Sequence, residues 1–476
     1  MTTVQPSPDP LKWAALLSNW QAGEGALYLR LARTVQGHIQ SGHLASWERL
    51  PAERRLAAQL GISRSTVVAA YDSLVAEGWT LRQRGSGSRV ARSAPRTASL
   101  LTLRSPAAAG GLIGEIDLTI AVPQLSPPHQ VRLQAASAHA FTHSQYHPPG
   151  LPELRAYLAQ MYTAQGLPTT YEQVIVTSGA QQAISLVATA LLRSGDLVVM
   201  ETPTYFGAID VFRAAGAELR GVPVGERGVD PDAFAAALRS SPRLAFLTPT
   251  FQNPTGTVMP ARARQRIARL CFDQQLPLIE DDSLIDLAFS ELNPPPRLSQ
   301  YEPGAPILNV GSLSKVFWAG LRVGWLRMPH SLCAQLTQHK TLADFGSSLP
   351  GQAMALALLR DLGSIRAERR AALGPERDRL ASLLSTHLPD WRFTIPPGGQ
   401  FLWLTLPTEQ ATAYTHLARR HGVRLFPGAA MSVGAAPDNT LRLPFTLPPE
   451  QLEEAVLRLA RAWAEFVERS PMERLA

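Results

Sequence analysis

Residues 307–325 of the sequence read ILNVGSLSKVFWAGLRVGW. The apolar run over 307–311 predicts a buried strand, and Lys315 follows its end with Ser312 on one side and Arg322 on the other. Ligands of α/β folds bind at the carboxyl ends of strands. Because lysine can form a Schiff base whereas arginine stays protonated, Lys315 is a candidate for chemistry with a carbonyl compound.

Lysine is rare in this chain, and its rarity makes Lys315 conspicuous. The sequence contains 45 basic residues, of which three are lysines, Lys12, Lys315 and Lys340, and the other 42 are arginines. Ordinary surface charge is therefore carried by arginine. A surface lysine remains the alternative interpretation of Lys315 taken alone, and the sequence suggests no role for Lys12 or Lys340.

Four more strand-like runs precede residue 307, and helical stretches alternate with them. This alternation predicts an α/β domain with a largely parallel sheet. The runs cover residues 174–177, 197–201, 244–248 and 276–281, with helices expected from about residue 180 and over 261–273.

The residues that follow these runs suit a single cofactor. Ser178–Gln181 opens a helix, where free N–H groups favour a phosphate, although such a turn is also a common structural junction. Glu201–Tyr205 offers an aromatic face, and Glu280–Asp282 is a cluster of carboxylates. Pyridoxal phosphate needs a lysine, a carboxylate for the ring nitrogen and donors for the phosphate, so each role has a candidate.

Length and charge predict more than one domain. The chain has 476 residues, about three times the usual length of a domain, and 45% of them are hydrophobic, as in a globular protein. Residues 1–100 hold 12 Lys or Arg and 6 Asp or Glu, so they carry +6 of the total net charge of +7. This asymmetry favours an N-terminal module that faces an anion such as nucleic acid; a basic end without function is the alternative.

Cysteines and hydropathy exclude several other classes of protein. Cys271 and Cys333 are isolated and lack metal-ligand spacing, so we expect neither a disulfide framework nor a metal site. The N-terminal residues MTTVQPSPDP lack the pattern of a signal peptide, and no run reaches the roughly 18 apolar residues of a membrane span. We expect a cytoplasmic protein that does not associate with membranes.

The basic module has the pattern of two helices joined by a tight turn. Apolar residues recur every four positions over 26–41, which predicts a helix. Residues 50–60 predict a short second helix closed by Gly61, and Ser63 is a candidate N-cap of a third helix that ends near Glu77. Residues 79–90 can then form a hairpin. This order is typical of a winged helix-turn-helix.

The module resembles the winged helix-turn-helix of GntR-family transcription regulators through LPAER at 50–54, SRSTV at 63–67 and RGSG at 84–87. It departs from the family at Ser46-Trp47, where a Pro-Gly turn is usual. The resemblance implies an α+β DNA-binding domain over residues 20–92 and double-stranded operator DNA as its partner. The residues implied to contact DNA are Arg54, Arg64, Ser65, Thr66, Arg84 and Gly85.

Residues from about 115 to 465 resemble the fold type I aminotransferases of class I and II, through NPTG at 253–256 and SLSK at 312–315. A winged helix followed by such a body looks like the MocR group of bacterial transcription regulators. The resemblance implies a flexible linker over 93–115 and an α/β transferase fold of type I, dependent on pyridoxal phosphate, over 116–470, with a large part over about 116–360 and a small C-terminal α+β part over about 361–470.

The same resemblance implies pyridoxal 5′-phosphate as the cofactor and assigns roles around it. Lys315 would hold the cofactor as a Schiff base, and Asp281 would pair with the ring nitrogen. Arg442 would receive the carboxylate of a small amino compound that acts as effector. Asn253 would contact the phenolic oxygen and Tyr205 the ring, and the phosphate ligands would be Gly179, Ala180, Gln181, Ser312 and Arg322, with Tyr146 from the partner subunit of a homodimer.

Two departures from the family pattern bear on activity. Ser283 and Leu284 stand where the family usually has a tyrosine that contacts the phenolic oxygen, and Ala121-Val122-Pro123 stands where relatives often have a glycine before the proline. Cofactor binding tolerates both changes more readily than fast transamination does. We expect a non-catalytic regulator that senses pyridoxal phosphate or an amino compound, and the alternative is an active aminotransferase with an accessory DNA-binding domain. The linker is long enough for a head-to-tail exchange of domains between subunits.

Overall fold

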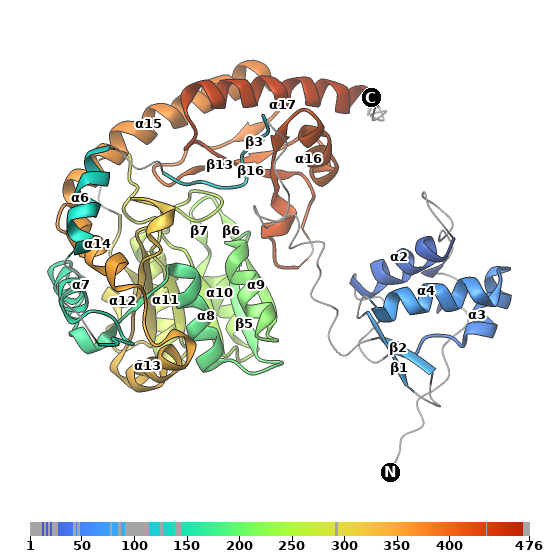
Figure 1. Cartoon of the computed structure of the whole chain (residues 1–476), viewed down its shortest axis with the longest axis horizontal. Coiled ribbons are helices and arrows are strands. Elements are labelled where there is room, and N and C mark those ends of the chain that lie inside the picture. The colour runs from blue at the N-terminus through green and yellow to red at the C-terminus, as the bar shows by residue number, and fades with distance from the viewer. Residues whose placement is uncertain are drawn as a thin grey trace, which may run out of the picture. The chain divides into compact units, whose positions relative to one another are not determined.

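The computed structural model describes residues 12–13, 16–17, 20, 27–40, 44, 48–76, 79–83, 87–90, 114–123, 127–138, 145–290, 294–434 and 436–469. The chain forms two compact units, the head, residues 1–109, and the body, residues 110–476 (Figure 1). Of the expected linker at 93–115, all but Gly114 and Glu115 lies outside the described residues. No helix in the described ranges is long and apolar enough to cross a membrane.

In the head, a helical pair is followed by a hairpin, as the sequence predicts. Gly61 ends the first helix of the pair with φ of 66°, a left-handed conformation that glycine adopts without strain. Ser63 Oγ accepts a hydrogen bond of 3.1 Å from the N–H of Thr66 and so caps the next helix. The elements are α2 Leu27–Gln40, α3 Glu53–Leu60, α4 Arg64–Ala76, β1 Thr80–Gln83 and β2 Gly87–Val90, with β1 and β2 antiparallel.

The core of the head begins before the predicted boundary at residue 20. Trp13 and Leu17 are buried in the same apolar cluster as Trp20 and the helices. Lys12 Nζ lies 2.6 Å from Glu48 Oε1, which gives this lysine a structural role that the sequence did not suggest. The apolar core of the head therefore includes side chains on the N-terminal side of residue 20.

A mixed sheet of eight strands forms the centre of the large part of the body (Figure 1). Its order is β4-β11-β10-β9-β8-β5-β6-β7. The predicted α/β sheet is confirmed, except that β11 runs antiparallel between β10 and β4 and that β7 returns antiparallel along β6. The strands are β4 Val174–Thr177, β5 Leu197–Thr202, β6 Glu218–Gly225, β7 Gly228–Val229, β8 Leu244–Leu247, β9 Leu278–Asp281, β10 Ile307–Ser312 and β11 Gly324–Arg327.

Helices cover both faces of this sheet, since successive strand residues point to opposite sides. Val198 and Met200 pack with α8, α9 and α13, whereas Val199 and Ala245 pack with α10, α11 and α12. Burial of both faces explains why the strands read as continuous apolar runs. The elements are α6 Pro127–Ala138, α7 Pro152–Ala164, η2 Tyr171–Gln173, α8 Ala180–Leu191, α9 Phe206–Ala214, α10 Pro231–Leu238, α11 Ala261–Asp273, α12 Leu298–Tyr301, η3 Ala319–Leu321, α13 His330–Asp344 and α14 Leu349–Leu359.

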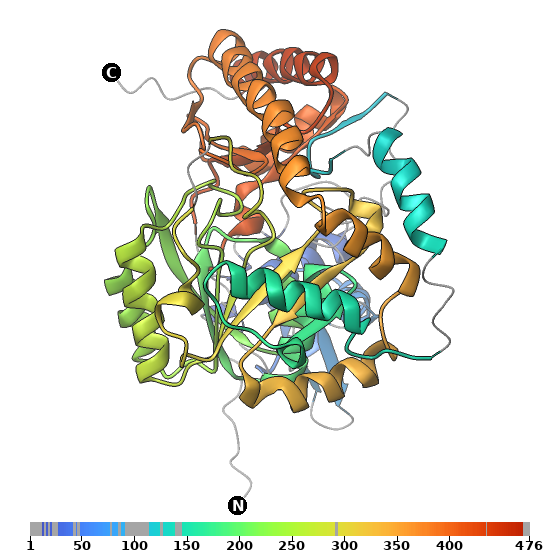
Figure 2. The same ribbon diagram turned by 90° about the vertical axis from the view of Figure 1, so that its left-hand side faces the viewer.

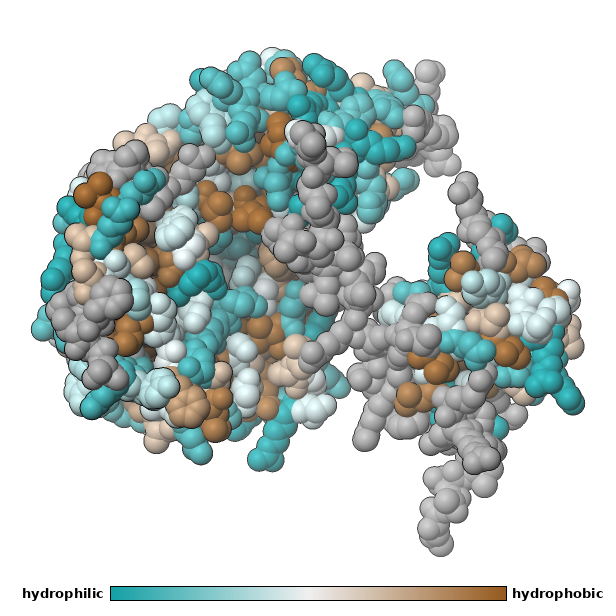
Figure 3. All heavy atoms as spheres, viewed as in Figure 1, coloured by the Kyte–Doolittle hydropathy of each residue, from teal (hydrophilic) through white to brown (hydrophobic). Residues whose placement is uncertain are grey.

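The C-terminal part of the body is a separate sheet-and-helix layer. Its strands have the order β12-β13-β16-β15, and the helices α15 and α17 lie side by side (Figure 2). Figure 3 shows mainly hydrophilic residues over the outer side of these two helices. The elements are α15 Leu362–His387, β12 Arg392–Phe393, β13 Phe401–Thr405, α16 Ala411–Arg420, β14 Val423–Arg424, β15 Phe426–Pro427, η4 Gly428–Met431, β16 Thr440–Pro444 and α17 Pro449–Arg469.

One strand pair crosses the predicted division of the body. β3, Ile116–Asp117, pairs in parallel with β14, so residues that the sequence assigned to the large part are held by the C-terminal part. The two strands are about 300 residues apart in the sequence, and a two-residue strand has no period to detect. The pairing leads into the segment that contains Ala121, whose carbonyl accepts a hydrogen bond from Lys315 just beyond the end of β10.

We expect Gly324→Ala to destabilise the body, because a Cβ at this position would lie 2.8 Å from backbone atoms of Gly179 and from the Gly311 carbonyl oxygen. Overpacking of this kind costs about 1–3 kcal/mol of unfolding free energy, which urea unfolding measures. The control is Gly363→Ala in α15, where a Cβ would have nothing within 4 Å and should be neutral or stabilising by up to about 1 kcal/mol. Equal destabilisation by both variants would contradict this interpretation.

Candidate functional site

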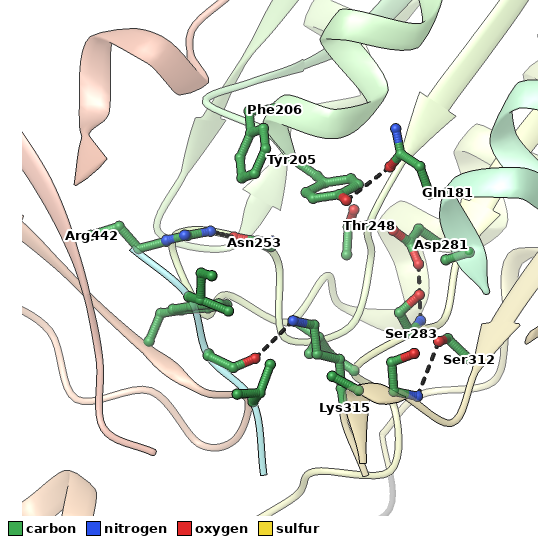
Figure 4. Close-up of a pocket in the computed structure, with 18 of the residues that line it drawn as sticks. Gln181, Tyr205, Phe206, Thr248, Asn253, Asp281, Ser283, Ser312, Lys315 and Arg442 are labelled. Atoms are coloured by element: carbon green, nitrogen blue, oxygen red, sulfur yellow. Dashed lines mark hydrogen bonds between the residues drawn. The ribbon is translucent and has the colours of Figure 1, made fainter. Parts of the chain in front are cut away.

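The carboxyl ends of the central strands open into a cavity of about 290 Å³ in the body. Strand ends of the large part, the first turn of α8, residues 119–122 and side chains of β13 and β16 line it. Figure 4 shows the labelled side chains converging on this space. The expected site residues found in its lining are Ala180, Gln181, Tyr205, Asn253, Asp281, Ser312, Lys315, Arg322 and Arg442.

Lys315 lies three residues beyond β10 and points into the cavity (Figure 4). Its Nζ donates a hydrogen bond of 2.8 Å to the Ala121 carbonyl, and Gln400 Nε2 donates to the Lys315 carbonyl at 3.0 Å. Burial and then the charge of Arg442 lower the pKa of Lys315 to about 8, against the opposing effect of Asp281. The amine is therefore partly unprotonated near neutral pH, as a nucleophile requires.

Asp281 ends β9 and faces the same cavity. Its Oδ1 accepts a hydrogen bond of 2.9 Å from the N–H of Ser283. Burial raises the pKa of Asp281 to about 6, and the hydrogen bonding of Ser283 and the charge of Lys315 oppose this rise. At pH 7 the side chain is mainly a carboxylate, able to balance a positive charge on a bound ring.

The turn before α8 forms a cradle for an anion. Gly179 has φ of 102°, and a Cβ there would lie 3.1 Å from Nη2 of Arg322. Arg322 Nη2 itself donates to the Ser178 carbonyl at 2.6 Å, so the guanidinium lies against the turn. The first N–H groups of a helix have no partner within it, and together with a guanidinium they suit a phosphate.

Two buried polar atoms of the cavity fit a bound cofactor with anionic groups. Ser314 Oγ and Arg442 Nε have no hydrogen-bond partner among the described residues. The backbone N–H of Ser314 donates a hydrogen bond of 3.2 Å to Oγ of Ser312, two residues earlier. Unsatisfied buried donors are costly, so these atoms indicate a site completed by a ligand. The donor set of lysine, carboxylate and anion cradle fits pyridoxal phosphate.

Tyr205 forms one wall of the cavity. Its hydroxyl donates to Gln181 Oε1 at 2.9 Å, and Gln181 Nε2 donates to the Gly207 carbonyl at 3.0 Å. Burial raises the pKa of Tyr205 to about 12, so the phenol stays neutral. The side chain of Gln181 thus fixes the ring of Tyr205, while the backbone N–H of Gln181 belongs to the first turn of α8.

Arg442 on β16 is a buried cation held by neutral groups. Its Nη2 donates to the Thr119 carbonyl at 2.6 Å and its Nη1 to Asn253 Oδ1 at 3.2 Å. The guanidinium lies 4.2 Å from the ring centre of Phe401 and 5.1 Å from that of Phe426. Burial lowers the pKa of Arg442 to about 10, and no carboxylate of the described residues pairs with it. A carboxylate ligand would supply the missing counter-charge.

One expected site residue lies elsewhere. Tyr146, expected to reach the phosphate of a partner subunit, is 82% exposed and lies outside the cavity of its own chain, with its ring centre 6.0 Å from that of Phe345. Ser283 and Leu284, the two positions where the family resemblance implies a tyrosine, both line the cavity, and Leu284 is buried. Leu284 contributes an apolar side chain to the wall.

The head presents several of the residues expected to contact DNA near the start of α4. Arg54, Arg64 and Ser65 are exposed and Thr66 is half-buried. Arg64 Nη2 lies 3.2 Å from Glu53 Oε2, an ion pair that a phosphate could replace. Arg84 and Gly85 lie outside the described residues.

Sequence reasoning missed a second set of cavity residues. Ala121 and Val122 belong to the stretch in which the sequence already departs from the family pattern. Thr119, Ile120 and the rings of Phe206 and Phe401 line the site without having been singled out for it. Phe206 directly follows Tyr205, and Thr248, which also lines the cavity, ends a predicted strand. The sequence could have identified both as site residues from their proximity to a motif. The segment that accepts the hydrogen bond of Lys315 is 194 residues away in the sequence, and no local pattern connects the two.

Comparisons with known proteins match both units. Residues 114–459 match the aminotransferase class I and II family, and residues 27–90 match the bacterial regulatory proteins of the gntR family. The uncharacterized HTH-type transcriptional regulator YisV of Bacillus subtilis is 31% identical over 82% of this chain and 86% of its own length. The probable rhizopine catabolism regulatory protein MocR of Rhizobium meliloti is 29% identical over 77% of this chain and 78% of its own.

Among solved structures, LysN of Thermus thermophilus, an α-aminoadipate aminotransferase in complex with N-(5′-phosphopyridoxyl)-L-leucine, has a TM-score of 0.69 and 31% sequence identity. The match covers 75% of this chain and 93% of that one. Relatives of the body thus include both regulators and an enzyme, and the body itself is aminotransferase-like.

We expect the labelling of Lys315 by formaldehyde and a borohydride in the cofactor-free protein to rise with a midpoint near pH 8. The cause is the burial that lowers its pKa from 10.5, together with the charge of Arg442. Because the chain has three lysines, peptide mass spectrometry can follow each separately. Arg442→Gln should move the midpoint upward by removing a neighbouring positive charge. A midpoint near 10.5 in both proteins would contradict the proposed environment.

Proposed function

We propose that this chain is a DNA-binding transcription regulator whose body senses pyridoxal phosphate or an amino compound that reacts with it. The chain belongs to the class I and II aminotransferase family and joins that domain to a gntR-type regulatory domain, as MocR and its relatives do. The observation that carries this proposal is the convergence of Lys315, Asp281 and the Gly179 turn with Arg442 in one cavity of a chain that also has a helix-turn-helix. We propose a cytoplasmic location, which the DNA-binding domain supports.

Pyridoxal phosphate is the cofactor that the family and the phosphopyridoxyl-bearing structural relative imply. When bound, it supplies an aldehyde that condenses with primary amines and a ring that withdraws electrons. We assign Lys315 as the amine that holds it, Asp281 as the carboxylate beside the ring nitrogen and Asn253 as the partner of the phenolic oxygen. The first turn of α8, Ser312 and Arg322 would bind the phosphate.

Arg442 defines the class of effector in this proposal. It is a buried guanidinium without a carboxylate partner in the described residues, and it lies in the same cavity as the amine of Lys315. A ligand that carries both an amino group and a carboxylate would meet both groups at once. We therefore propose a small amino acid or a related amino carboxylate as the effector.

Leu284 supports sensing rather than rapid turnover. A leucine side chain cannot donate a hydrogen bond to the phenolic oxygen, so Asn253 alone would fulfil this role. Binding depends on the sum of contacts, whereas catalysis depends on those that strengthen in the transition state. Loss of one donor beside the reacting system is compatible with cofactor binding and weakens transamination.

We further propose a homodimer. Tyr146, Leu342 and Phe345 are large apolar side chains that the body exposes, and Tyr146 and Phe345 lie next to each other. Exposed apolar groups of this size are typical of interaction sites. A second copy would cover them and bring Tyr146 to the neighbouring phosphate site, and the linker would allow each head to lie on the other subunit.

The first experiment measures DNA affinity of wild type and Lys315→Ala on the intergenic fragment upstream of the gene, with and without pyridoxal phosphate and amino acids. Wild type should change its Kd by at least about fivefold, the lower end of allosteric coupling, and Lys315→Ala should not respond. An identical response of the two proteins would contradict sensing through Lys315. Repeated turnover of an amino donor with a 2-oxo acid would favour the enzyme instead.

The second experiment addresses the head. We expect Arg64→Ala to weaken binding to the same fragment by about 1–3 kcal/mol and to make the salt dependence less steep, because an arginine at the start of α4 would contact a base or a phosphate. The matched control is Arg379→Ala on α15, which removes another exposed arginine with a carboxylate neighbour, Glu453, at 3.6 Å. Equal affinity of both variants would contradict the assignment.

A further inference from the structure

Lys340, on α13, is a fully buried cation outside the cofactor cavity. Its Nζ donates to Asp344 Oδ2 at 2.6 Å, to Ser347 Oγ at 2.9 Å and to Gln182 Oε1 at 3.0 Å. An ammonium has three N–H donors, so each of them has a partner. We call Lys340, Gln182, Asp344 and Ser347 the Lys340 cluster.

The Lys340 cluster joins α13 to the start of α8. Gln182, on the first turn of α8, donates from Nε2 to Asp344 Oδ2 at 2.7 Å and so contacts both the cation and its counter-ion. Asp344 Oδ1 also accepts the N–H of Gly346 at 2.9 Å. Burial opposes ionisation of Asp344, but the hydrogen bonds from Lys340 and Gln182 outweigh it and lower the pKa of this carboxyl. The cluster is thus a charged hydrogen-bond network that holds α13 against α8.

Hydrogen bonds connect the Lys340 cluster to the turn that precedes Gly179. The N–H of Ser178 donates to Gln182 Oε1 at 2.8 Å, and the carbonyl of Ser178 accepts from Arg322 Nη2 at 2.6 Å. The peptide groups on both sides of Ser178 are therefore held, one by the Lys340 cluster and one by a residue that lines the cavity. Rotation of this turn would break one of the two bonds and move the N–H groups of Gly179 and Ala180.

Helix packing alone does not require a buried lysine here. Desolvation of the buried Lys340 ammonium offsets much of the stability gained from its pairing with the partly exposed Asp344, and apolar residues can join two helices at lower cost. The chain uses arginine for almost all of its other positive charges. A compact ammonium with three donors can meet three acceptors in different directions, which a planar guanidinium cannot do in the same space. This geometry is suited to fixing the position of a turn.

We propose that the Lys340 cluster positions the Ser178-Gly179 turn for the phosphate group, and that it thereby sets the affinity of the body for phosphorylated ligands. None of its four members lines the cavity, so they are positioning residues and not ligands. This inference rests on the proposed cofactor site. Its specific consequence is that disruption of the cluster weakens binding of the phosphate and leaves the reaction at Lys315 unchanged.

The test compares pyridoxal phosphate with pyridoxal, which has the aldehyde but no phosphate. In Gln182→Leu, α8 loses its bonds to Ser178, Lys340 and Asp344. The Kd for pyridoxal phosphate, measured by absorption titration, should rise about tenfold, equivalent to one or two lost hydrogen bonds, with an unchanged Kd for pyridoxal. Ser347→Ala, which removes one acceptor of Lys340 and leaves α8 intact, should act in the same direction with a smaller change.

The matched control is Gln335→Leu. Gln335 on α13 donates from Nε2 to the Ala190 carbonyl of α8 at 2.8 Å, so this variant breaks a bond between the same two helices at the end distant from the turn. It should leave both Kd values unchanged. Parallel loss of affinity for both ligands in Gln182→Leu and Ser347→Ala, or an unchanged Kd for pyridoxal phosphate, would overturn the inference. Failure of the wild type to bind pyridoxal phosphate would instead contradict the proposed cofactor site.

Discussion

The arrangement of the cavity depends on three consecutive carboxyl groups at the end of β9. Side chains alternate along a strand, so Glu280 and Asp282 point to one side of the sheet and Asp281 to the other. Arg297 Nε lies 2.7 Å from Asp282 Oδ2, and Asn309 Nδ2 donates to Glu280 Oε2 at 2.8 Å. These bonds hold the strand end on the face opposite Asp281. Burial raises the pKa of all three carboxyl groups. Asp281 can face the ligand because Arg297 and Asn309 bind its two neighbours on the opposite face.

The charges in the cavity favour a ligand, or a pair of ligands, with two anionic groups. Lys315, Arg322 and Arg442 line the space, and the carboxylate of Asp281 faces them there. Burial, with repulsion from Arg442 and Arg322, lowers the pKa of Lys315, so the free site is electrostatically unfavourable in its fully charged form. A phosphate beside Arg322 and a carboxylate beside Arg442 would each remove part of this cost. A ligand that binds the folded body in this way also stabilises it.

The sequence predicted those parts of the site that follow strands in unbroken motifs, because strand ends of a parallel sheet meet at one edge. Lys315, Asp281 and the Gly179 turn belong to this group. The long-range partners could not be predicted. Ala121 reaches Lys315 through the pairing of β3 with β14, and Lys340 reaches Gln182 across 158 residues. The sequence suggested no role for Lys340, because its contacts depend on the packing of α13 on α8, which no local pattern encodes.

A sensor, unlike an enzyme, must use the binding free energy of its ligand to shift a conformational equilibrium. To shift a two-state equilibrium from 1:99 to 99:1, a ligand must favour one state by about 5.5 kcal/mol. Hydrogen bonds to charged groups contribute about 1.5–3 kcal/mol each. One anionic group at either arginine therefore falls short unless it makes several such bonds, whereas a phosphate at the Gly179 turn and a carboxylate at Arg442 can together supply the difference. Under the proposed function, the head would then respond to the combination of cofactor and amino compound more strongly than to either one.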